Sequence, residues 1–161
     1  MEGHIAEVGV YQGGSAEIIA NYKETHKHLF LFDTFEGLPD PDGKDWHKKG
    51  DFNDTDYETI RIHFKQFPNV HVYKGFFPND TAHHVENVRF SFVHIDVDLY
   101  QCYLDCLNFF YRRMTQGGII AMDDYGASSC PGAKLAVDKF FQNLPENLIW
   151  PTSCQIAVVK Q

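Results

Sequence analysis

The sequence predicts an α/β fold in which a mostly parallel β-sheet is covered by helices on both faces. Two observations predict it. Short apolar runs alternate with amphipathic helical patterns along the chain, and the first five runs each lead into glycines or aspartates. The length of 161 residues allows a single domain, spanning residues 1–161. In such sheets, ligands bind at the carboxyl ends of the strands, near the point where strand order reverses.

Hydrophobic periodicity places each element in turn. Seven strands are expected, at residues 5–10, 29–32, 70–74, 90–97, 119–122, 148–150 and 155–159. Helices are expected at residues 15–23, 57–67, 99–114 and 133–144, with a short helix or turn at 81–87. Ser15 is expected to cap the first helix and Gly117-Gly118 to end the third, while Pro151-Thr152-Ser153 would join the last two strands.

Residues 37–56 form a polar segment rich in Pro, Gly, Asp and Lys. The segment is longer than a simple connection needs, and long loops of this kind often act as lids. Trp46 and His47 within it would then close over a substrate.

Charge and composition exclude several classes of protein. The chain has 14 Lys and Arg against 22 Asp and Glu, so its net charge of −8 leaves no basic footprint for nucleic acid. No apolar run approaches the roughly 18–20 residues that span a membrane. The chain begins almost at its first strand, which leaves no room for a signal peptide, so we expect a cytoplasmic protein.

The four cysteines and nine histidines disfavour zinc. No cysteine belongs to a Cys-x-x-Cys pair, Cys130 and Cys154 are isolated, and the histidines lack helical ligand spacing. Reduced, half-buried thiols are expected instead.

The end of the first strand and the end of the second favour an adenosine ligand. Gly9, Gly13 and Gly14 allow a sharp turn and a close backbone approach, but their spacing differs from the dinucleotide fingerprint, so no pyrophosphate is specified. Asp33 lies 19 residues beyond Gly14, where a carboxylate can accept both hydroxyls of a ribose. Gly75 and the neighbouring Phe76 would add backbone approach and an apolar wall. A plain tight turn and a loop aspartate are the alternatives.

Four aspartates follow the fourth and fifth strands. If the strand continues, Asp96 and Asp98 point to the same side, and Asp123 and Asp124 end a neighbouring strand about 4.8 Å away. Unpaired, the carboxylates would raise one another's pKa, and oxygen-only ligands indicate Mg²⁺, Mn²⁺ or Ca²⁺. His94 shares their parity and is expected to be a buried, hydrogen-bonded residue. The alternative is that Asp98 and Asp124 only cap the segments that follow them.

Four stretches together resemble the macrocin O-methyltransferase family. They are Glu7-Val8-Gly9-Val10-Tyr11-Gln12-Gly13-Gly14-Ser15, Asp33-Thr34-Phe35-Glu36-Gly37-Leu38-Pro39, His94-Ile95-Asp96-Val97-Asp98-Leu99-Tyr100 and Gly117-Gly118-Ile119-Ile120-Ala121-Met122-Asp123-Asp124-Tyr125. The resemblance runs in order from about Ile5 to Lys160. It implies a Rossmann-like class I methyltransferase fold whose last strand is antiparallel. It also implies dependence on S-adenosylmethionine and Mg²⁺, with sugar hydroxyls of natural products as acceptors.

The resemblance also assigns roles to residues. The implied metal ligands are Asp96, Asp123 and Asp124, and Asp98 would be the general base. The candidate cofactor-binding residues are Glu7, Gly9, Tyr11, Gly13, Gly14, Ser15, Asp33, Thr34, Gly75 and Phe76. Family members usually carry an N-terminal helical segment before the first strand, and we expect this sequence to be a short version without it.

The expected function is therefore methyl transfer from S-adenosylmethionine to a hydroxyl of a small molecule, either a sugar or a vicinal diol or catechol. Two alternatives stay open: a non-catalytic cofactor-binding module or fragment, and an Asp-x-Asp phosphotransferase of the haloacid dehalogenase type. In that last class the motif follows the first strand, whereas here it follows the fourth. We expect a small-molecule acceptor, no nucleic-acid or membrane partner, and leave a homodimer open.

Overall fold

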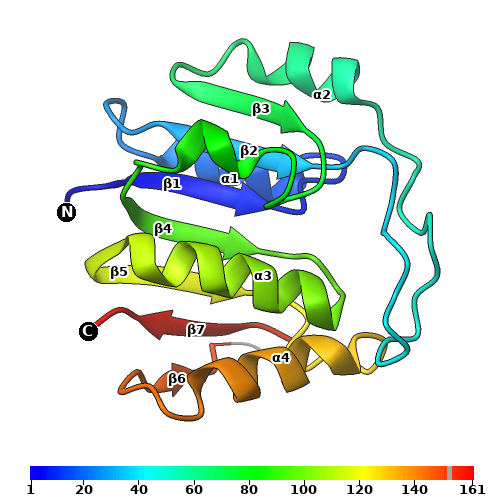
Figure 1. Ribbon diagram of the computed structural model, residues 1–161. Helices are drawn as coiled ribbons and strands as arrows, with labels where there is room; N and C mark the ends of the chain where they lie inside the picture. Colours follow the sequence, from blue (N-terminus) through cyan, green and yellow to red (C-terminus); the bar gives the residue numbers. More distant parts are fainter. Residues whose placement is uncertain (152–153) are drawn as a thin grey trace.

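The computed structural model describes residues 1–151 and 154–161, and its centre is a seven-stranded sheet. The strands lie in the order β3-β2-β1-β4-β5-β7-β6 (Figure 1). Their bounds are β1 His4–Val8, β2 Leu29–Asp33, β3 Val70–Lys74, β4 Phe90–Ile95, β5 Met114–Met122, β6 Leu148–Ile149 and β7 Ile156–Val159. β7 is antiparallel to both its neighbours, and the pairs among β1 to β5 are parallel, which confirms the predicted mixed sheet.

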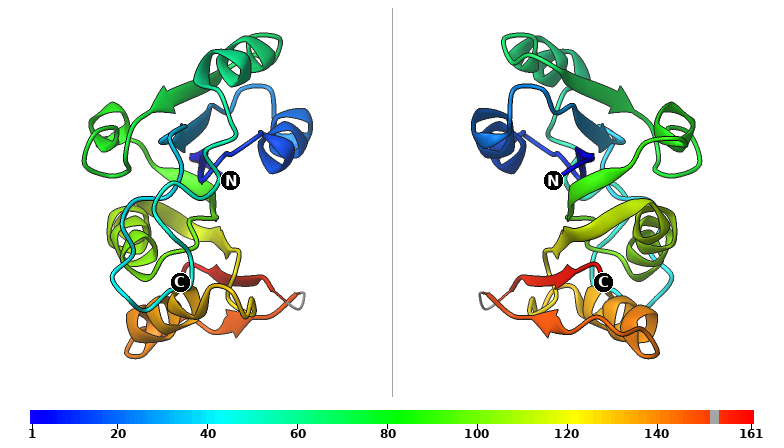
Figure 2. Two further views of the ribbon diagram at one scale, coloured as in Figure 1. Left: turned by 90° about the vertical axis from the view of Figure 1, so that its right-hand side faces the viewer. Right: turned by 90° about the vertical axis from the view of Figure 1, so that its left-hand side faces the viewer.

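Helices cover both faces of this sheet (Figure 2). Helices α1 (Gly14–Tyr22) and α2 (Tyr57–Phe64) lie on one face, where an apolar cluster buries Ile60 and Phe64 against β1 and β2. Helices α3 (Tyr100–Phe110) and α4 (Pro131–Phe141) lie on the other face, with the short 3₁₀ helices η1 (Ala82–Val85) and η2 (Tyr111–Arg113). Strands β1, β2 and β3 run outward in one direction, and β4 and β5 run outward in the other, so strand order reverses between β1 and β4.

Two predicted helix boundaries are wrong. Helix α1 begins at Gly14 with Gly13 as its N-cap, so Ser15 lies inside the helix and its hydroxyl donates to Glu7 instead. Helix α3 ends at Phe110, and Gly117-Gly118 belong to β5. Gly117 has φ +80° and lies where the pairing of β4 with β5 shifts register, so the glycines serve a bulge rather than a helix end. The predicted link at Thr152-Ser153 lies outside the described residues.

The prediction that β4 continues to Val97 is also wrong. The strand ends at Ile95, and Asp98 has φ +55°, a left-handed conformation that breaks strand alternation. Asp98 still lies at the carboxyl end of the sheet, where it lines the cavity. Its left-handed turn places it there, and not the strand alternation that the sequence predicts.

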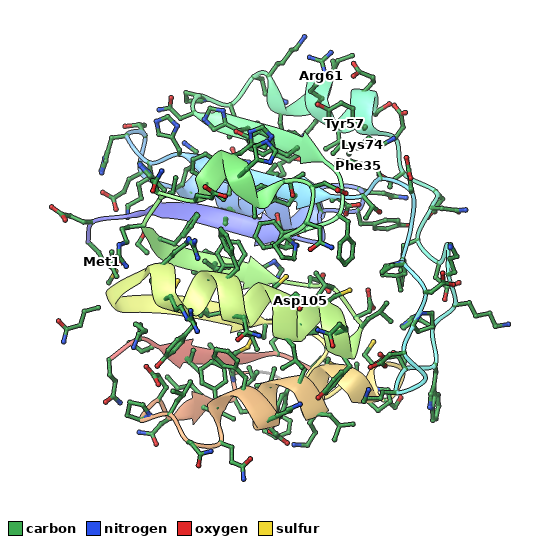
Figure 3. All side chains as sticks on the ribbon, in the orientation of Figure 1. Met1, Phe35, Tyr57, Arg61, Lys74 and Asp105 are labelled. Carbon is green, nitrogen blue, oxygen red and sulfur yellow. The ribbon has the colours of Figure 1, made fainter. Side chains whose placement is uncertain are left out.

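The segment from β2 to α2 contains no regular helix or strand, as expected for residues 37–56. It passes the carboxyl ends of the central strands and reaches the start of α4 before returning to α2 (Figure 1). Phe35 packs on Tyr57, with ring centroids 5.4 Å apart, where the segment leaves β2 and rejoins α2 (Figure 3). Within the part of the chain that the structure describes, no helix has the length and apolar character to cross a membrane.

Candidate functional site

A cavity of about 260 Å³ opens at the carboxyl ends of β1, β2 and β4, beside the point where strand order reverses. This is the place at which parallel sheets bind ligands. Its walls come from the strand ends, the segment after β2 and the turn after β3. Predicted site residues among them are Gly9, Tyr11, Asp33, Thr34, Gly75, Phe76, Asp96, Asp98 and Asp124.

Gly9 brings the β1 and β4 ends of the cavity together. Its φ is +86°, and a Cβ there would lie 1.6 Å from the backbone oxygen of Asp96. A side chain at this position is therefore excluded by backbone and not by a movable group. Gly9 does allow a close backbone approach, but its near neighbour is the backbone of Asp96 and not a ligand.

Asp33 ends β2, and its carboxylate holds the turn after β1. Oδ2 accepts the backbone N–H groups of Val10 and Tyr11, each at 2.8 Å, and Oδ1 accepts that of Phe35 at 2.7 Å. A carboxylate has about four lone-pair positions, so one remains after these three bonds. Asp33 thus positions the glycine turn and still faces the cavity.

Glu7 lies beneath the glycine turn and is fully buried. Its Oε1 accepts from the Ser15 hydroxyl at 2.5 Å and lies 2.8 Å from Nδ1 of His94, while Oε2 has no hydrogen-bond partner among the described residues. Burial lowers the pKa of His94, but its hydrogen bond and ion pair with Glu7 raise that pKa overall. His94 is thus the buried, hydrogen-bonded residue that its sequence position predicts.

Glu7, Gly13, Gly14 and Ser15 do not line the cavity. They support the turn from below or open α1, so their contacts with a cofactor stay predictions. Tyr11 and Thr34 do line it, and the Tyr11 hydroxyl donates to Asp54 at 2.8 Å.

Carboxylates crowd the opposite wall of the cavity. Burial, followed by the charges of Asp124, Asp123 and Asp98, raises the pKa of Asp96 from 3.8 to about 9. Burial and the charge of Asp123 also raise the pKa of Asp124, whose Oδ2 is buried without a hydrogen-bond partner among the described residues. A cation at this wall would relieve the repulsion and supply the missing partner.

The four aspartates do not contribute equally. Asp123 lies outside the cavity lining, because its Oδ1 accepts the N–H of Asp124 and its Oδ2 accepts from Gln155. Asp98 is 15% exposed, and burial with the charge of Asp124 raises its pKa to about 6.

Asp98 does not cap α3, so the capping alternative is wrong for this residue. The N-cap of α3 is Leu99, which makes no side-chain cap, and Asp45 from the 37–56 segment caps the helix from outside. Asp45 Oδ2 accepts the N–H of Tyr100, and its Oδ1 accepts the N–H of Gly132 at the start of α4, both at 3.0 Å. No sequence signal points to this double cap, since Asp45 is one of several aspartates in a polar segment.

His47 lies beside Asp98, which lines the cavity, whereas Trp46 is 76% exposed, and closure of either residue over a substrate stays a prediction. The Nε2 atom of His47 lies 3.5 Å from Oδ1 of Asp98 and 3.4 Å from Sγ of Cys130. The segment thus touches the site through His47 and the helix starts through Asp45.

Comparison with known proteins agrees with this arrangement. The family model described as macrocin O-methyltransferase matches residues 1–150. A Streptomyces olivaceus protein named 8-demethyl-8-(2,3-dimethoxy-alpha-L-rhamnosyl)-tetracenomycin-C 4'-O-methyltransferase is 26% identical over 81% of this chain and 56% of its own length. The demethyldecarbamoylnovobiocin O-methyltransferase of Streptomyces niveus is 26% identical over 86% of this chain and 58% of its own length. The chain therefore spans little more than half the length of these curated relatives.

Solved structures give the same fold. The O-methyltransferase NovP superimposes with a TM-score of 0.83 at 22% identity, covering 99% of this chain and 72% of NovP. An O-methyltransferase from Bacillus cereus in complex with SAH superimposes with a TM-score of 0.67 at 17% identity, covering 98% of this chain and 74% of its own. These likenesses establish the class I methyltransferase fold. Since the family model covers nearly the whole sequence, the chain belongs to the macrocin O-methyltransferase family.

Proposed function

We propose that this chain transfers the methyl group of S-adenosylmethionine to a sugar hydroxyl of a small natural product, with the help of Mg²⁺. One observation carries the proposal. A single cavity at the switch point of the sheet has a glycine turn and Asp33 at one end and carboxylates of raised pKa at the other. One curated relative is named as a methyltransferase of a rhamnosyl-tetracenomycin and another as one of demethyldecarbamoylnovobiocin, which supports a sugar-bearing natural product as the acceptor.

The β1–β2 end suits the cofactor. Asp33 keeps one lone-pair position after its three backbone bonds, enough for one ribose hydroxyl and not for the two that its sequence position predicts. Gly75, with φ +145°, and Phe76 line the wall beyond β3, where an adenine ring would lie against backbone and an apolar ring. S-adenosylmethionine, when bound, supplies an electrophilic methyl group on a sulfonium.

The β4–β5 end suits a hard divalent ion. Asp124 offers a buried oxygen without a hydrogen-bond partner among the described residues, and burial and neighbouring charges raise the pKa of Asp96. Carboxylate oxygens are the ligands that Mg²⁺ prefers, and bound Mg²⁺ lowers the pKa of a coordinated hydroxyl. Asp96 and Asp124 would hold the ion, and Asp123 would join only by giving up its bond from Gln155.

Asp98 is the residue that we assign as the general base. Its pKa of about 6 leaves it ionised at neutral pH while making it a stronger base than an ordinary aspartate. It takes the proton of the acceptor hydroxyl as the oxygen attacks the methyl carbon. The protein's remaining task is to hold oxygen, carbon and sulfur in line, with the reacting atoms about 3–3.5 Å apart.

Calorimetric titration with S-adenosylmethionine, with and without Mg²⁺, tests the proposal. We expect saturable binding of the cofactor in both buffers, and methyl transfer to a sugar or vicinal-diol acceptor only with Mg²⁺. A folded protein that binds no S-adenosylmethionine would contradict the proposal. Cofactor binding without turnover of any acceptor would favour a binding module, and hydrolysis of a phosphomonoester would favour the phosphotransferase alternative.

A further inference from the structure

Three side chains of different chemistry meet beside the carboxylate wall. His47 comes from the 37–56 segment, Asp98 from the turn after β4, and Cys130 from the residue before α4. Nε2 of His47 lies 3.4 Å from Sγ of Cys130, which lies 3.5 Å from Oδ1 of Asp98, and that oxygen lies 3.5 Å from Nε2. All three are shielded, with His47 16%, Asp98 15% and Cys130 2% exposed.

The size of this triangle fits one metal ion. Zinc binds sulfur at about 2.3 Å, imidazole nitrogen at about 2.0–2.1 Å and carboxylate oxygen at about 2.0–2.2 Å. Tetrahedral angles then place sulfur about 3.5 Å from either of the other two donors, and nitrogen about 3.3 Å from oxygen. The three distances in the structure lie within about 0.2 Å of these values. The two sulfur distances also suit S–H hydrogen bonds, but the 3.5 Å between Nε2 of His47 and Oδ1 of Asp98 is long for one, so hydrogen bonding leaves that side of the triangle unexplained.

The other nitrogen of His47 is already oriented for such a role. Nδ1 lies 3.1 Å from Oδ2 of Asp51, which fixes the ring. With Nδ1–H donating to Asp51, Nε2 presents its lone pair to Cys130 and Asp98. A carboxylate bound to the far nitrogen is the usual support of a metal-binding histidine.

We propose that His47, Asp98 and Cys130 form a site for a zinc-class ion, separate from the carboxylates that suit Mg²⁺. The thiolate and imidazole donors select Zn²⁺ over Mg²⁺, whereas Asp96 and Asp124 offer oxygen alone. Binding forms three protein–metal bonds and releases the Cys130 thiol proton to solvent, leaving the fourth position for water. The ion joins the 37–56 segment to the turn after β4 and to the start of α4, so it pins the segment across the cavity.

Zinc at this site would also inhibit methyl transfer, because it occupies the oxygen of Asp98. This consequence depends on the proposed function, whereas the ion site itself does not. Metal binding is therefore measured directly and not through turnover.

Titration of the purified protein with Co²⁺, in excess Mg²⁺ and under reducing conditions, tests the site. We expect one equivalent to produce a thiolate-to-cobalt charge-transfer band together with the visible absorption of a tetrahedral ion, and Zn²⁺ to abolish both. Cys130→Ser should remove the charge-transfer band, His47→Gln should remove the tetrahedral absorption, and Asp51→Asn should weaken binding by about 10–100-fold. The exposed Cys154 and His26 supply matched controls, Cys154→Ser and His26→Gln, which should keep the full spectrum.

Absence of the charge-transfer band in the wild type, or its survival in Cys130→Ser, would overturn the site. His47→Gln alters a loop side chain, so it decides the question even if Cys130→Ser does not fold. A protein that binds cobalt in this way but no S-adenosylmethionine would support the ion site and contradict the proposed function. A protein that binds S-adenosylmethionine but gives no such cobalt spectrum would contradict the ion site and leave the proposed function standing.

Trypsin tests the pinning of the segment, which carries Lys48 and Lys49. We expect Zn²⁺ to slow cleavage after these lysines in the wild type and to leave it unchanged in His47→Gln. Equal cleavage rates with and without Zn²⁺ in the wild type would overturn the pinning.

Discussion

The two ends of the cavity treat their carboxylates in opposite ways. At the β1–β2 end, Asp33 receives three backbone N–H groups, so its charge is compensated by the protein itself. At the β4–β5 end, Oδ2 of Asp124 has no hydrogen-bond partner within residues 1–151 and 154–161, and the pKa of Asp96 rises to about 9 because burial and neighbouring charges oppose its ionisation. One end is built as a completed hydrogen-bonded turn, and the other is completed only by a proton or a cation.

The difference separates structural from chemical demand. Removing a carboxylate that accepts backbone N–H groups lowers the stability of the fold. Removing a carboxylate that repels its neighbours raises it. The same substitution, aspartate to asparagine, should therefore have opposite effects at the two ends.

The largest effect is expected where the two ends meet. Gly9→Ala would place a Cβ 1.6 Å from the Asp96 backbone oxygen at a φ of +86°, so we expect a loss of more than about 4 kcal/mol in the free energy of unfolding, or failure to fold. Urea denaturation measures the loss. Gly14→Ala is the control, because nothing lies within 4 Å of its added Cβ. Equal stability of the two variants would show that Gly9 does not contact the backbone of Asp96 as closely as described.

Asp98→Asn should lower kcat by about 10²–10⁴, which corresponds to about 3–5 kcal/mol of barrier. The amide keeps the size of the side chain but cannot accept the acceptor's proton. Steady-state kinetics with a vicinal-diol or sugar acceptor measures the change, and calorimetry should give nearly unchanged affinities for the cofactor. Asp105→Asn, on α3 (Figure 3), is the control. Full activity of Asp98→Asn would remove it as the base and turn attention to His47.

The strand ends were predictable because they depend on local pattern. Alternating apolar runs fix the sheet, and a sheet brings Asp33, Asp96 and Asp124 to one edge whatever the loops do. The turn at Asp98 was not predictable in the same way, because its left-handed conformation overrides the alternation on which the prediction depended.

The path of the 37–56 segment could not be read from its composition. Asp45 caps helix starts that lie 55 and 87 residues away in sequence, and His47 meets Cys130 across 83 residues. Ligand spacing along the chain disfavours zinc, and the donors of the ion site that we propose approach one another only through folding. Polar segments carry many equivalent aspartates and histidines, so tertiary contacts alone decide which of them are used.

Asp33→Asn tests the compensated end. An amide has one oxygen and one nitrogen, so it must turn an N–H group towards either the Val10 and Tyr11 donors or the Phe35 donor. We expect the free energy of unfolding and the binding free energy of S-adenosylmethionine each to fall by about 1.5–3 kcal/mol. Asp40→Asn, in the exposed part of the loop, controls for loss of charge. Unchanged stability would mean that the three backbone bonds do not hold the turn.

The smallest effect, and the opposite sign, is expected at the uncompensated end. The pKa of Asp124 is raised above 3.8 in the folded protein, so between pH 3.8 and that raised pKa the folded chain binds more protons than the unfolded chain. Metal-free stability therefore falls as pH rises through this range. Asp124→Asn removes the charge and should raise the free energy of unfolding by about 1 kcal/mol at about pH 8 in chelator. The gain should shrink as pH falls towards 3.8 and disappear below it, where the wild-type carboxyl is protonated in both states. Saturating Mg²⁺ should reverse the gain, since the ion stabilises only the intact carboxylate set.

Melting temperatures across pH, with chelator and with Mg²⁺, measure both dependences. Destabilisation by Asp124→Asn in metal-free buffer at about pH 8 would show that its charge is compensated after all, and the contrast with Asp33 would fail.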